Sequence, residues 1–383
     1  MRIAVSDEDV EEYIGIINQI AQDHPILVDK YLMGKEIEVD AVCDGEDILI
    51  PGIMEHIERA GIHSGDSISV YPAQTISEKA KETIAEYTRR LAKALHVVGM
   101  INIQFIVCGE DVYVIEVNPR SSRTVPYISK VTGVPMVDLA TRIMMGEKLN
   151  EMGYETGLYP SSPYYAVKVP VFSFEKLSDV DTQLGPEMKS TGEVLGIAGT
   201  MEEALYKGMI AAGYYMKRNG GILISVRDTD KKDLKELAKA YVSMGFTIYA
   251  TEGTARKLNS AGISSTIVKK PKEADEGEET TISVMEKGRI SYVLSTSVTG
   301  RQPDRDSVRL RRKAVELGIP CLTSLDTAAV LALSLESKYD EDNVELIDIA
   351  HIVHGAADQD EARQIKNAED IHIPGYVLQG HAD

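Results

Sequence analysis

The chain has 383 residues, of which 43% are hydrophobic and 26% are charged, and its net charge is -19. This length predicts two or three globular domains, and the acidic balance argues against a general nucleic-acid-binding protein, which would present a basic surface. No apolar run approaches the roughly 20 residues of a membrane helix, and Met1 is not followed by a signal-peptide pattern. Three widely spaced cysteines fit a reducing compartment, so we expect a cytoplasmic protein.

The first half of the chain predicts a mixture of strands and helices. The segment 36–42 alternates acidic and apolar residues, the pattern of a half-buried strand. A glycine-bracketed loop from Gly61 to Asp66 carries His63 and Ser64, and an ordinary turn explains it equally well, because these residue types are common in turns. The predicted elements are strands at 2–5, 25–32, 36–42 and 48–53, and helices at 6–23, 78–96, 136–145 and 201–216.

The segment from Ile101 to Pro126 is the most informative stretch. INIQFIV and VYVIEV favour two strands, and CGED between them supplies the turn. Because side chains alternate between the two faces of a strand, we expect carboxamides and a carboxylate to gather at one end of the hairpin, next to two arginines. These residues are Asn102, Gln104, Glu116, Asn118, Arg120 and Arg123.

This set of side chains suits magnesium and a triphosphate. Mg²⁺ prefers oxygen ligands, which Glu116 and the amide oxygens of Gln104 and Asn118 would supply. Arginine offers a planar fork to phosphate oxygens, and phosphoryl transfer needs both metal and cationic side chains to neutralise charge. The alternative is the polar outer face of an ordinary antiparallel hairpin, although such a face usually carries lysine and glutamate.

The pattern changes after Asn219-Gly220-Gly221, the best candidate for a linker. Buried strands then alternate with helices, which predicts a doubly wound parallel sheet. The loops 225–231, 251–254 and 295–297 follow strands, and their hydroxyls, N–H groups and lysine favour an anion site, with plain helix N-caps as the alternative. The predicted elements are strands at 221–226, 246–250, 264–268 and 292–295, and helices at 231–244, 252–261, 307–317 and 327–335.

Several blocks resemble the C-terminal part of the large subunit of carbamoyl phosphate synthetase. They are GIMEHIERAGIHSGD at 52–66, INIQFIV at 101–107, IEVNPRSSRTVP at 115–126, SKVTGVP at 129–135, LGPEMKSTGEVLG at 184–196 and SVRDTDK at 225–231. The resemblance runs from Met1 to about Leu335 and implies a chain of mixed α/β and α+β class. A partial ATP-grasp domain, an antiparallel sheet with helices, would occupy 1–218. A methylglyoxal-synthase-like regulatory domain, with a doubly wound parallel sheet, would occupy 219–340, and an extension would occupy 341–383.

The resemblance also implies an activity and its residues. The activity is ATP-dependent phosphorylation of carbamate to carbamoyl phosphate, under allosteric nucleotide control, in pyrimidine and arginine biosynthesis, with ATP and Mg²⁺ or Mn²⁺ as cofactors. By similarity, Gln104, Glu116 and Asn118 would bind the metal, and Arg120 and Arg123 would face the phosphates. Glu36 would contact the ribose, and His63 and Ser64 the nucleotide. The effector phosphate would bind to Lys231, Thr251, Thr254, Lys270, Thr296 and Ser297.

The family subunit contains two such halves, so we expect this chain to be a fragment that does not make carbamoyl phosphate alone. Its implied partners are the remainder of the large subunit, the glutaminase small subunit and an allosteric nucleotide, but neither nucleic acid nor membrane. UMP is the commonest effector expected, while ornithine, IMP and phosphoribosyl pyrophosphate remain open.

The main alternative is a nucleotide-sensing binding module without catalysis. A methylglyoxal synthase with Asp304 or Asp306 as its base is a further alternative, which the GRQPDRD loop disfavours. Another ATP-grasp ligase, such as biotin carboxylase, would share the glutamate–asparagine metal pair but not the block at 52–66.

Overall fold

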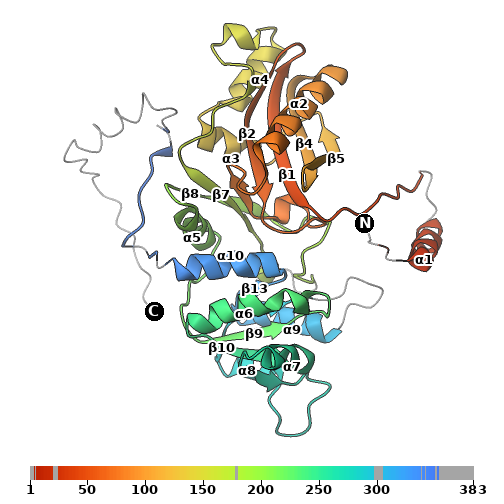
Figure 1. The fold of residues 1–383 in the computed structure, drawn as a ribbon, viewed down its shortest axis with the longest axis vertical. Helices are drawn as coiled ribbons and strands as arrows, with labels where there is room; N and C mark the ends of the chain where they lie inside the picture. The colour runs from red at the N-terminus through yellow and green to blue at the C-terminus, as the bar shows by residue number, and fades with distance from the viewer. Residues whose placement is uncertain are drawn as a thin grey trace.

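The chain forms two sheets of different kinds (Figure 1). The computed structural model describes residues 4, 6–19, 25–176, 180–296, 305–337, 339–340, 342–349 and 352. The first sheet has eight strands and the second has five. Among the described residues, no helix is long and apolar enough to cross a membrane.

The helices and strands have the following bounds. The helices are α1 (Asp7–Asn18), α2 (Glu78–Ala94), α3 (Val125–Thr132), α4 (Met136–Met144), α5 (Met201–Ala211), α6 (Leu234–Ser243), α7 (Glu252–Ser260), α8 (Thr281–Glu286), α9 (Arg305–Glu316) and α10 (Leu325–Glu336). The strands of the first sheet are β1 (Lys35–Asp44), β2 (Ile48–His56), β3 (Ser69–Tyr71), β4 (Val98–Cys108), β5 (Asp111–Asn118), β6 (Gly157–Leu158), β7 (Tyr165–Val171) and β8 (Gly192–Ala198). Those of the second are β9 (Gly221–Ser225), β10 (Thr247–Thr251), β11 (Thr266–Val268), β12 (Ile290–Ser295) and β13 (Cys321–Leu322).

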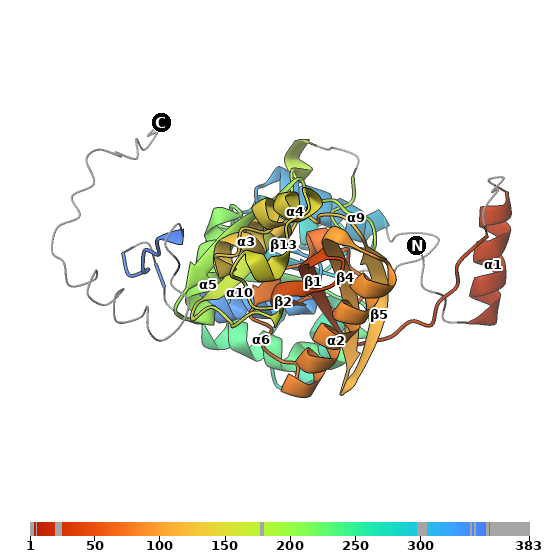
Figure 2. The same ribbon diagram turned by 90° about the horizontal axis from the view of Figure 1, so that it is seen from above.

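Helices cover both faces of the first sheet, whose strand order is β5-β4-β1-β2-β3-β7-β8 with β6 paired to β2 (Figure 2). All of its strand pairs are antiparallel except β2–β6. α2 packs on one face against Ile37 and Val39. α3 and α4 pack on the opposite face against Val42 and Met54. The remainder of that second face carries polar side chains, and we call it the polar face.

The alternating segment 36–42 lies inside the protein, so the prediction of a half-buried strand was wrong. β1 is buried from Glu36 to Asp44 because it lies between β2 and β4 in the middle of the sheet. Glu36, Glu38 and Asp40 are 8%, 3% and 1% exposed. Buried carboxylates are costly unless they are paired or hydrogen-bonded, so the polar face must contain their partners.

The second sheet is parallel throughout, in the order β11-β10-β9-β12-β13. α6, α7 and α10 contribute to the apolar cluster on one face, and α8 and α9 pack on the other. This arrangement confirms the predicted doubly wound sheet. The order reverses between β9 and β12, and the carboxyl edge at such a switch point is where ligands bind in these folds.

α10 joins the two sheets. It lies between α5 and α6 (Figure 1), and most of its residues are buried. One apolar cluster runs through it from Val167 of β7 to Ile222 of β9. The two sheets therefore share one hydrophobic core at this interface.

Two further segments differ from the sequence-based predictions. Residues 25–33 form no regular secondary structure, and Leu27 and Met33 are 82% and 81% exposed. A strand was wrong there because no neighbouring strand pairs with the segment. The helix predicted over 201–216 ends at Ala211, just before Gly213, whose φ of +89° suits a helix C-terminus. Most of the strand predicted at 2–5 lies outside the described residues.

Part of the C-terminal extension packs on the first sheet. The backbone N–H of Glu345 donates to Glu203 Oε1 of α5 at 2.6 Å, and Lys207 donates to the carbonyl of Glu345. Ile347 lies against the apolar cluster under α3 and α4. These described residues are anchored to the first sheet, while most of the extension predicted at 341–383 lies outside the described residues.

Candidate functional site

Strand pairing brings the predicted metal ligands together on the polar face. In β4 and β5, Gln104 lies opposite Glu116 and Asn102 opposite Asn118. In β1 and β4, Glu38 lies opposite Gln104 and Asp40 opposite Asn102. Directly opposed side chains in a sheet are neighbours, so three strands contribute oxygen atoms to one surface.

The three predicted ligands leave suitable oxygen atoms for a cation. The amide nitrogen of Gln104 donates to Ser64 Oγ at 3.0 Å, and the amide nitrogen of Asn118 donates to Glu116 Oε1 at 2.9 Å. Both amide oxygens therefore remain as acceptors, beside a carboxylate on the edge strand β5. One carboxylate and two amide oxygens are the ligand types that a hard divalent cation takes.

The glycine-bracketed loop lies next to this surface. The backbone N–H of Gly61 donates to Glu36 Oε1 at 3.1 Å, and His63 Nδ1 accepts from the N–H of Gly65 at 3.0 Å. The predicted nucleotide contacts Glu36, His63 and Ser64 thus stand around one loop. Lys168, only 1% exposed, donates to the carbonyl oxygen of Ser64 at 2.9 Å and fixes the loop from below.

The two predicted arginines are placed differently. Arg123 donates to Ser190 Oγ at 3.3 Å and so joins the 118–124 loop to the segment 180–190. Arg120 is exposed and donates to the carbonyl of its neighbour Ser121 at 2.9 Å. The described contacts therefore place Arg123 among the other candidate residues. For Arg120 they show only the bond to its neighbour.

A buried polar network lies beneath the candidate ligands, and the sequence did not reveal it. His56 of β2 is 3.3 Å from Glu36 through Nδ1 and 3.3 Å from Glu38 through Nε2. Asn102 donates to Glu38 at 2.9 Å and to Asp40 at 3.0 Å. Thr124 donates to Asp40 Oδ2 at 2.5 Å. The carboxylates that β1 carries into the interior are satisfied by these partners.

The network changes the acidity of its members. Burial lowers the pKa of His56, but hydrogen bonds to Glu36 and Glu38 outweigh it and raise that pKa to about 9. Burial raises the pKa of Glu38, yet the hydrogen bond and charge of His56 lower it to about 2. Burial and the charge of Glu38 raise the pKa of Asp40 to about 6. At neutral pH the floor of the polar face therefore holds an imidazolium between carboxylates.

The predicted effector residues gather at the carboxyl edge of the parallel sheet, which we call the effector edge. Thr251 Oγ1 lies 3.4 Å from both Ser225 Oγ and Thr254 Oγ1. Thr296 Oγ1 accepts from the N–H of Arg227 at 3.1 Å. These hydroxyls lie at or just after the carboxyl ends of three adjacent strands, β10, β9 and β12, as the sequence predicted.

Lysine completes the effector edge. Lys231 donates to Asp228 Oδ1 at 2.6 Å. Its Nζ lies 2.8 Å from the point where a Cβ on Gly253 would stand, so it covers the first turn of α7. Lys270 follows β11 at the same edge, with Nζ 4.0 Å from Glu273. Ser297 lies outside the described residues.

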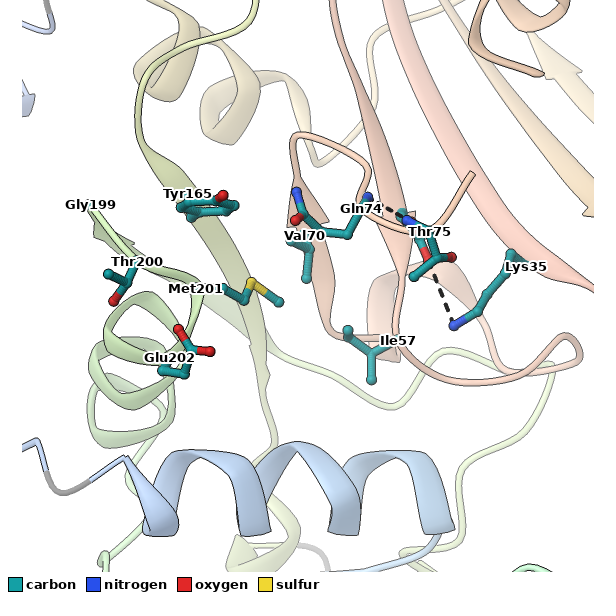
Figure 3. A pocket seen from close by; sticks show the side chains of 11 residues that line it. Lys35, Ile57, Val70, Gln74, Thr75, Tyr165, Gly199, Thr200, Met201 and Glu202 are labelled. Atoms are coloured by element: carbon teal, nitrogen blue, oxygen red, sulfur yellow. Dashed lines mark hydrogen bonds and ion pairs between the residues drawn. The ribbon is translucent and has the colours of Figure 1, made fainter. Parts of the chain in front are cut away.

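A cavity of about 550 Å³ lies on the other side of the first sheet (Figure 3). It is lined by Lys35, Glu55 and Thr75 near one end and by Thr200 at the start of α5. Glu55 is already satisfied, because the backbone N–H groups of Gln74 and Thr75 each donate to it at 2.8 Å. None of the predicted site residues lines this cavity, since side chains alternate between faces along β1 and β2.

Comparison with known families and proteins agrees with this architecture. Residues 1–152 match the model for the carbamoyl-phosphate synthase L chain, ATP binding domain, and residues 233–323 match the MGS-like domain. The carbamoyl phosphate synthase large chain of Lachnoclostridium phytofermentans is 57% identical over 92% of this chain and 33% of its own length. That of Agathobacter rectalis is 57% identical over 89% of this chain and 32% of its own length.

Among solved structures, the biotin carboxylase domain of a single-chain bacterial carboxylase is 18% identical, with a TM-score of 0.38 over 50% of this chain and 48% of that one.

The two sheets and the two family matches define the class of this protein as an ATP-binding domain followed by an MGS-like domain. Over about nine tenths of its residues the chain is similar to carbamoyl phosphate synthase large chains. It spans about a third of the length of the curated relatives it matches.

Proposed function

We propose that the polar face binds ATP with a divalent cation and supports transfer of the γ-phosphoryl group to carbamate. The observation that carries this proposal is the pairing of Gln104 with Glu116 beneath Ser64. It sets oxygen ligands for a cation against a glycine-bracketed loop whose backbone can approach a nucleotide closely. Mg²⁺ or Mn²⁺, when bound, would neutralise charge on the transferring phosphate.

The proposal assigns a role to each of the candidate residues. Gln104, Glu116 and Asn118 would hold the cation through oxygen atoms. Arg123, fixed beside Ser190, would face the phosphates. Glu36 and the loop carrying His63 would orient the nucleotide, and the buried network beneath would keep these groups in place. Preorganised positioning and charge neutralisation are the main contributions a protein makes to this chemistry.

The proposal concerns a site and not the complete synthesis. The relatives named carbamoyl phosphate synthase large chain are about three times as long. We propose that full activity also involves the remainder of such a large chain and a glutaminase subunit that supplies ammonia.

The reverse half-reaction tests the proposal. The 383-residue chain would be incubated with ADP, Mg²⁺ and carbamoyl phosphate, and ATP formation followed by luminescence. Binding of ATP–Mg²⁺ would be measured separately by calorimetry. ATP formation together with binding supports phosphoryl transfer, and binding alone supports only the nucleotide site. Failure to bind ATP–Mg²⁺ contradicts the proposal.

A second candidate function is a nucleotide-sensing module. The effector edge favours it, because buried hydroxyls and Lys231 at the N-terminus of α7 suit a phosphate monoester. Titration with UMP in the calorimeter tests this function. Binding of UMP without binding of ATP–Mg²⁺ would make the module the better description of the isolated chain.

A further inference from the structure

The segment between α5 and β9, residues 212–220, joins the first sheet to the second and contains a chemically reactive pair. We call it the joining segment. Asn219 is followed by Gly220, and this is the only asparagine–glycine pair in the sequence. The backbone nitrogen of the residue after an asparagine can attack the side-chain amide carbon, because the two atoms close a five-membered ring. A side chain on that following residue hinders the attack, and glycine has none.

The structure leaves this pair accessible to water. The stretch from Lys217 to Gly220 is exposed and lies outside any helix or strand. Within the ranges that the structure describes, no residue forms a hydrogen bond with the Asn219 side chain or with the N–H of Gly220. Secondary structure normally occupies backbone N–H groups, and that protection is missing at the nitrogen that would attack.

The backbone carbonyls of the same two residues are held by the parallel sheet. Ser291 Oγ of β12 donates to the carbonyl of Asn219 at 2.8 Å. The N–H of Thr247, the first residue of β10, donates to the carbonyl of Gly220 at 2.9 Å. The pair therefore stands directly before β9, the middle strand of that sheet, and a change in its backbone would act on both neighbouring strands.

Packing also requires glycine at position 220. The φ of Gly220 is +109°, which L side chains rarely adopt. A Cβ at this position would overlap Ser291 Oγ. The residues that would slow the attack by their bulk are thus excluded by the fold, so the reactive pair is a consequence of how β9 begins.

A second pair in the chain shows what protection of such a site requires. Asp44 and Gly45 could close the same ring, but Asp44 is only 6% exposed. Its carboxylate accepts hydrogen bonds from the backbone N–H groups of Glu46, Asp47 and Leu149 at 2.9, 2.8 and 3.0 Å. Ring closure there would break these buried bonds, which is costly, whereas ring closure at Asn219 breaks none.

We propose that Asn219 is a site of spontaneous deamidation. The Gly220 nitrogen loses its proton to hydroxide and bonds to Asn219 Cγ, and the bond from Cγ to Nδ2 breaks as the side-chain nitrogen leaves as ammonia. Water then opens the resulting succinimide at either carbonyl, which gives aspartate or isoaspartate without oxidation or reduction.

The isoaspartate product should loosen the start of β9. In this product the main chain runs through the former side chain and gains one methylene group, and a carboxylate is added. The carbonyls of residues 219 and 220 then cannot both keep the bonds that Ser291 and Thr247 donate.

The rate of deamidation in the full chain tests the site. Folded protein and protein unfolded in guanidinium chloride would be aged at mildly alkaline pH, digested and compared by mass spectrometry. A methyltransferase specific for isoaspartate identifies the product. We expect Asn219 to react in the folded chain within about threefold of its rate in the unfolded chain, because the fold offers no protection there. A larger reduction by the fold overturns the proposal.

Two variants show whether the product arises at this position. Asn219→Gln should remove the isoaspartate from the joining segment, because glutamine would have to close a six-membered ring, which forms much more slowly. Asn150→Gln changes an exposed asparagine outside the joining segment and should age like the wild type. Wild-type amounts of isoaspartate in aged Asn219→Gln would place the reaction elsewhere and overturn the assignment.

Hydrogen exchange on the aged protein tests the effect on the sheet. In aged wild type, the Thr247 amide should show a second, faster-exchanging population whose fraction matches the isoaspartate content. Aged Asn219→Gln should lack this population. Full protection of the Thr247 amide in protein that contains isoaspartate at position 219 overturns the loosening of β9.

Discussion

The polar face of the first sheet and the effector edge of the second would both bind a nucleotide, yet they present opposite chemistry to its phosphates. The polar face is built on carboxylates, with Glu116 among the candidate ligands and Glu38 and Asp40 buried beneath it. The effector edge offers the hydroxyls of Thr251 and Thr296 and the ammonium group of Lys231. A phosphate would approach the carboxylates of the first surface with a metal cation between, but it can contact the second surface directly.

The difference also shows in how each region is stabilised. The polar face contains buried charges that need partners before any ligand arrives. His56 is such a partner, because it lies within hydrogen-bond distance of the carboxylates of Glu36 and Glu38. The effector edge contains mainly neutral hydroxyls, which are much less costly to bury. We therefore expect substitutions in the buried network beneath the polar face to affect folding, and substitutions at the effector edge to affect only binding.

The largest effect is expected from His56→Ala. The substitution leaves Glu36 and Glu38 buried without their cationic partner, and breaking a buried ion pair in this way costs about 3–5 kcal/mol of the free energy of unfolding. Urea denaturation measures the loss. Arg89→Ala, which removes an exposed pair with Glu86 on α2, is the control and should cause no comparable loss. Equal stability of the two variants would refute the structural role of the network.

The contribution of His56 should also appear in the pH dependence of the free energy of unfolding. The pKa of His56 is raised from 6.5 to about 9 in the folded protein. A raised pKa means that the stabilisation is complete below pH 6.5 and is lost as the pH rises through about 9, by roughly 3 kcal/mol. Urea unfolding between pH 6 and pH 10 measures this slope. His56→Gln should make the slope shallower, and a wild-type stability that does not fall in this range contradicts the assignment.

Glu116→Gln should weaken ATP–Mg²⁺ binding about 10- to 100-fold, because a neutral amide replaces the charged cation ligand. The protein should remain folded, since Glu116 is exposed on the edge strand β5. Glu82→Gln makes the same chemical change at an exposed position of α2 and should leave binding unaltered. Calorimetry compares the two variants. Equal affinity of the two variants would show that Glu116 is not a cation ligand. It would also contradict the proposed difference between the polar face and the effector edge.

The smallest effect is expected from Lys231→Met. Loss of one charge-assisted hydrogen bond should weaken UMP binding about tenfold, while ATP–Mg²⁺ binding and thermal stability stay as in the wild type. Lys235→Met, an exposed change on the neighbouring helix α6, is the matched control. Reduced ATP–Mg²⁺ affinity in Lys231→Met without reduced UMP affinity would reverse the assignment of the two sites.

The sequence predicted the fold better than it predicted the surroundings of the candidate site. Local patterns predicted the parallel sheet and the hairpin that pairs Gln104 with Glu116, and the family resemblance implied the antiparallel sheet. Strand periodicity also placed Glu36, Glu38 and Asp40 on one face. It could not show that this face is buried, because the position of β1 between β2 and β4 is a property of the whole sheet. His56 and Asn102 were therefore missed as partners of buried carboxylates.

Long-range contacts escaped the sequence for a similar reason. Arg311 donates to Asp181 through Nε at 2.7 Å and through Nη2 at 2.6 Å, although the two are 130 residues apart. The segment 180–190 has no periodicity that reveals its neighbours. The sequence offers one indication of this contact, which is the basic helix α9 that starts soon after the predicted effector loop. That pattern fits an exposed helix equally well, and only the fold shows that one of its arginines is buried.

The location of a bound metal ion tests the central claim most directly. Crystals of the 383-residue chain grown with ATP and Mn²⁺ would be measured at the manganese absorption edge. We predict an anomalous peak within about 2.0–2.3 Å of oxygen atoms from Gln104, Glu116 and Asn118, with the nucleotide against the loop that carries His63 and Ser64. A peak elsewhere, or a nucleotide bound without these three side chains, would contradict the account.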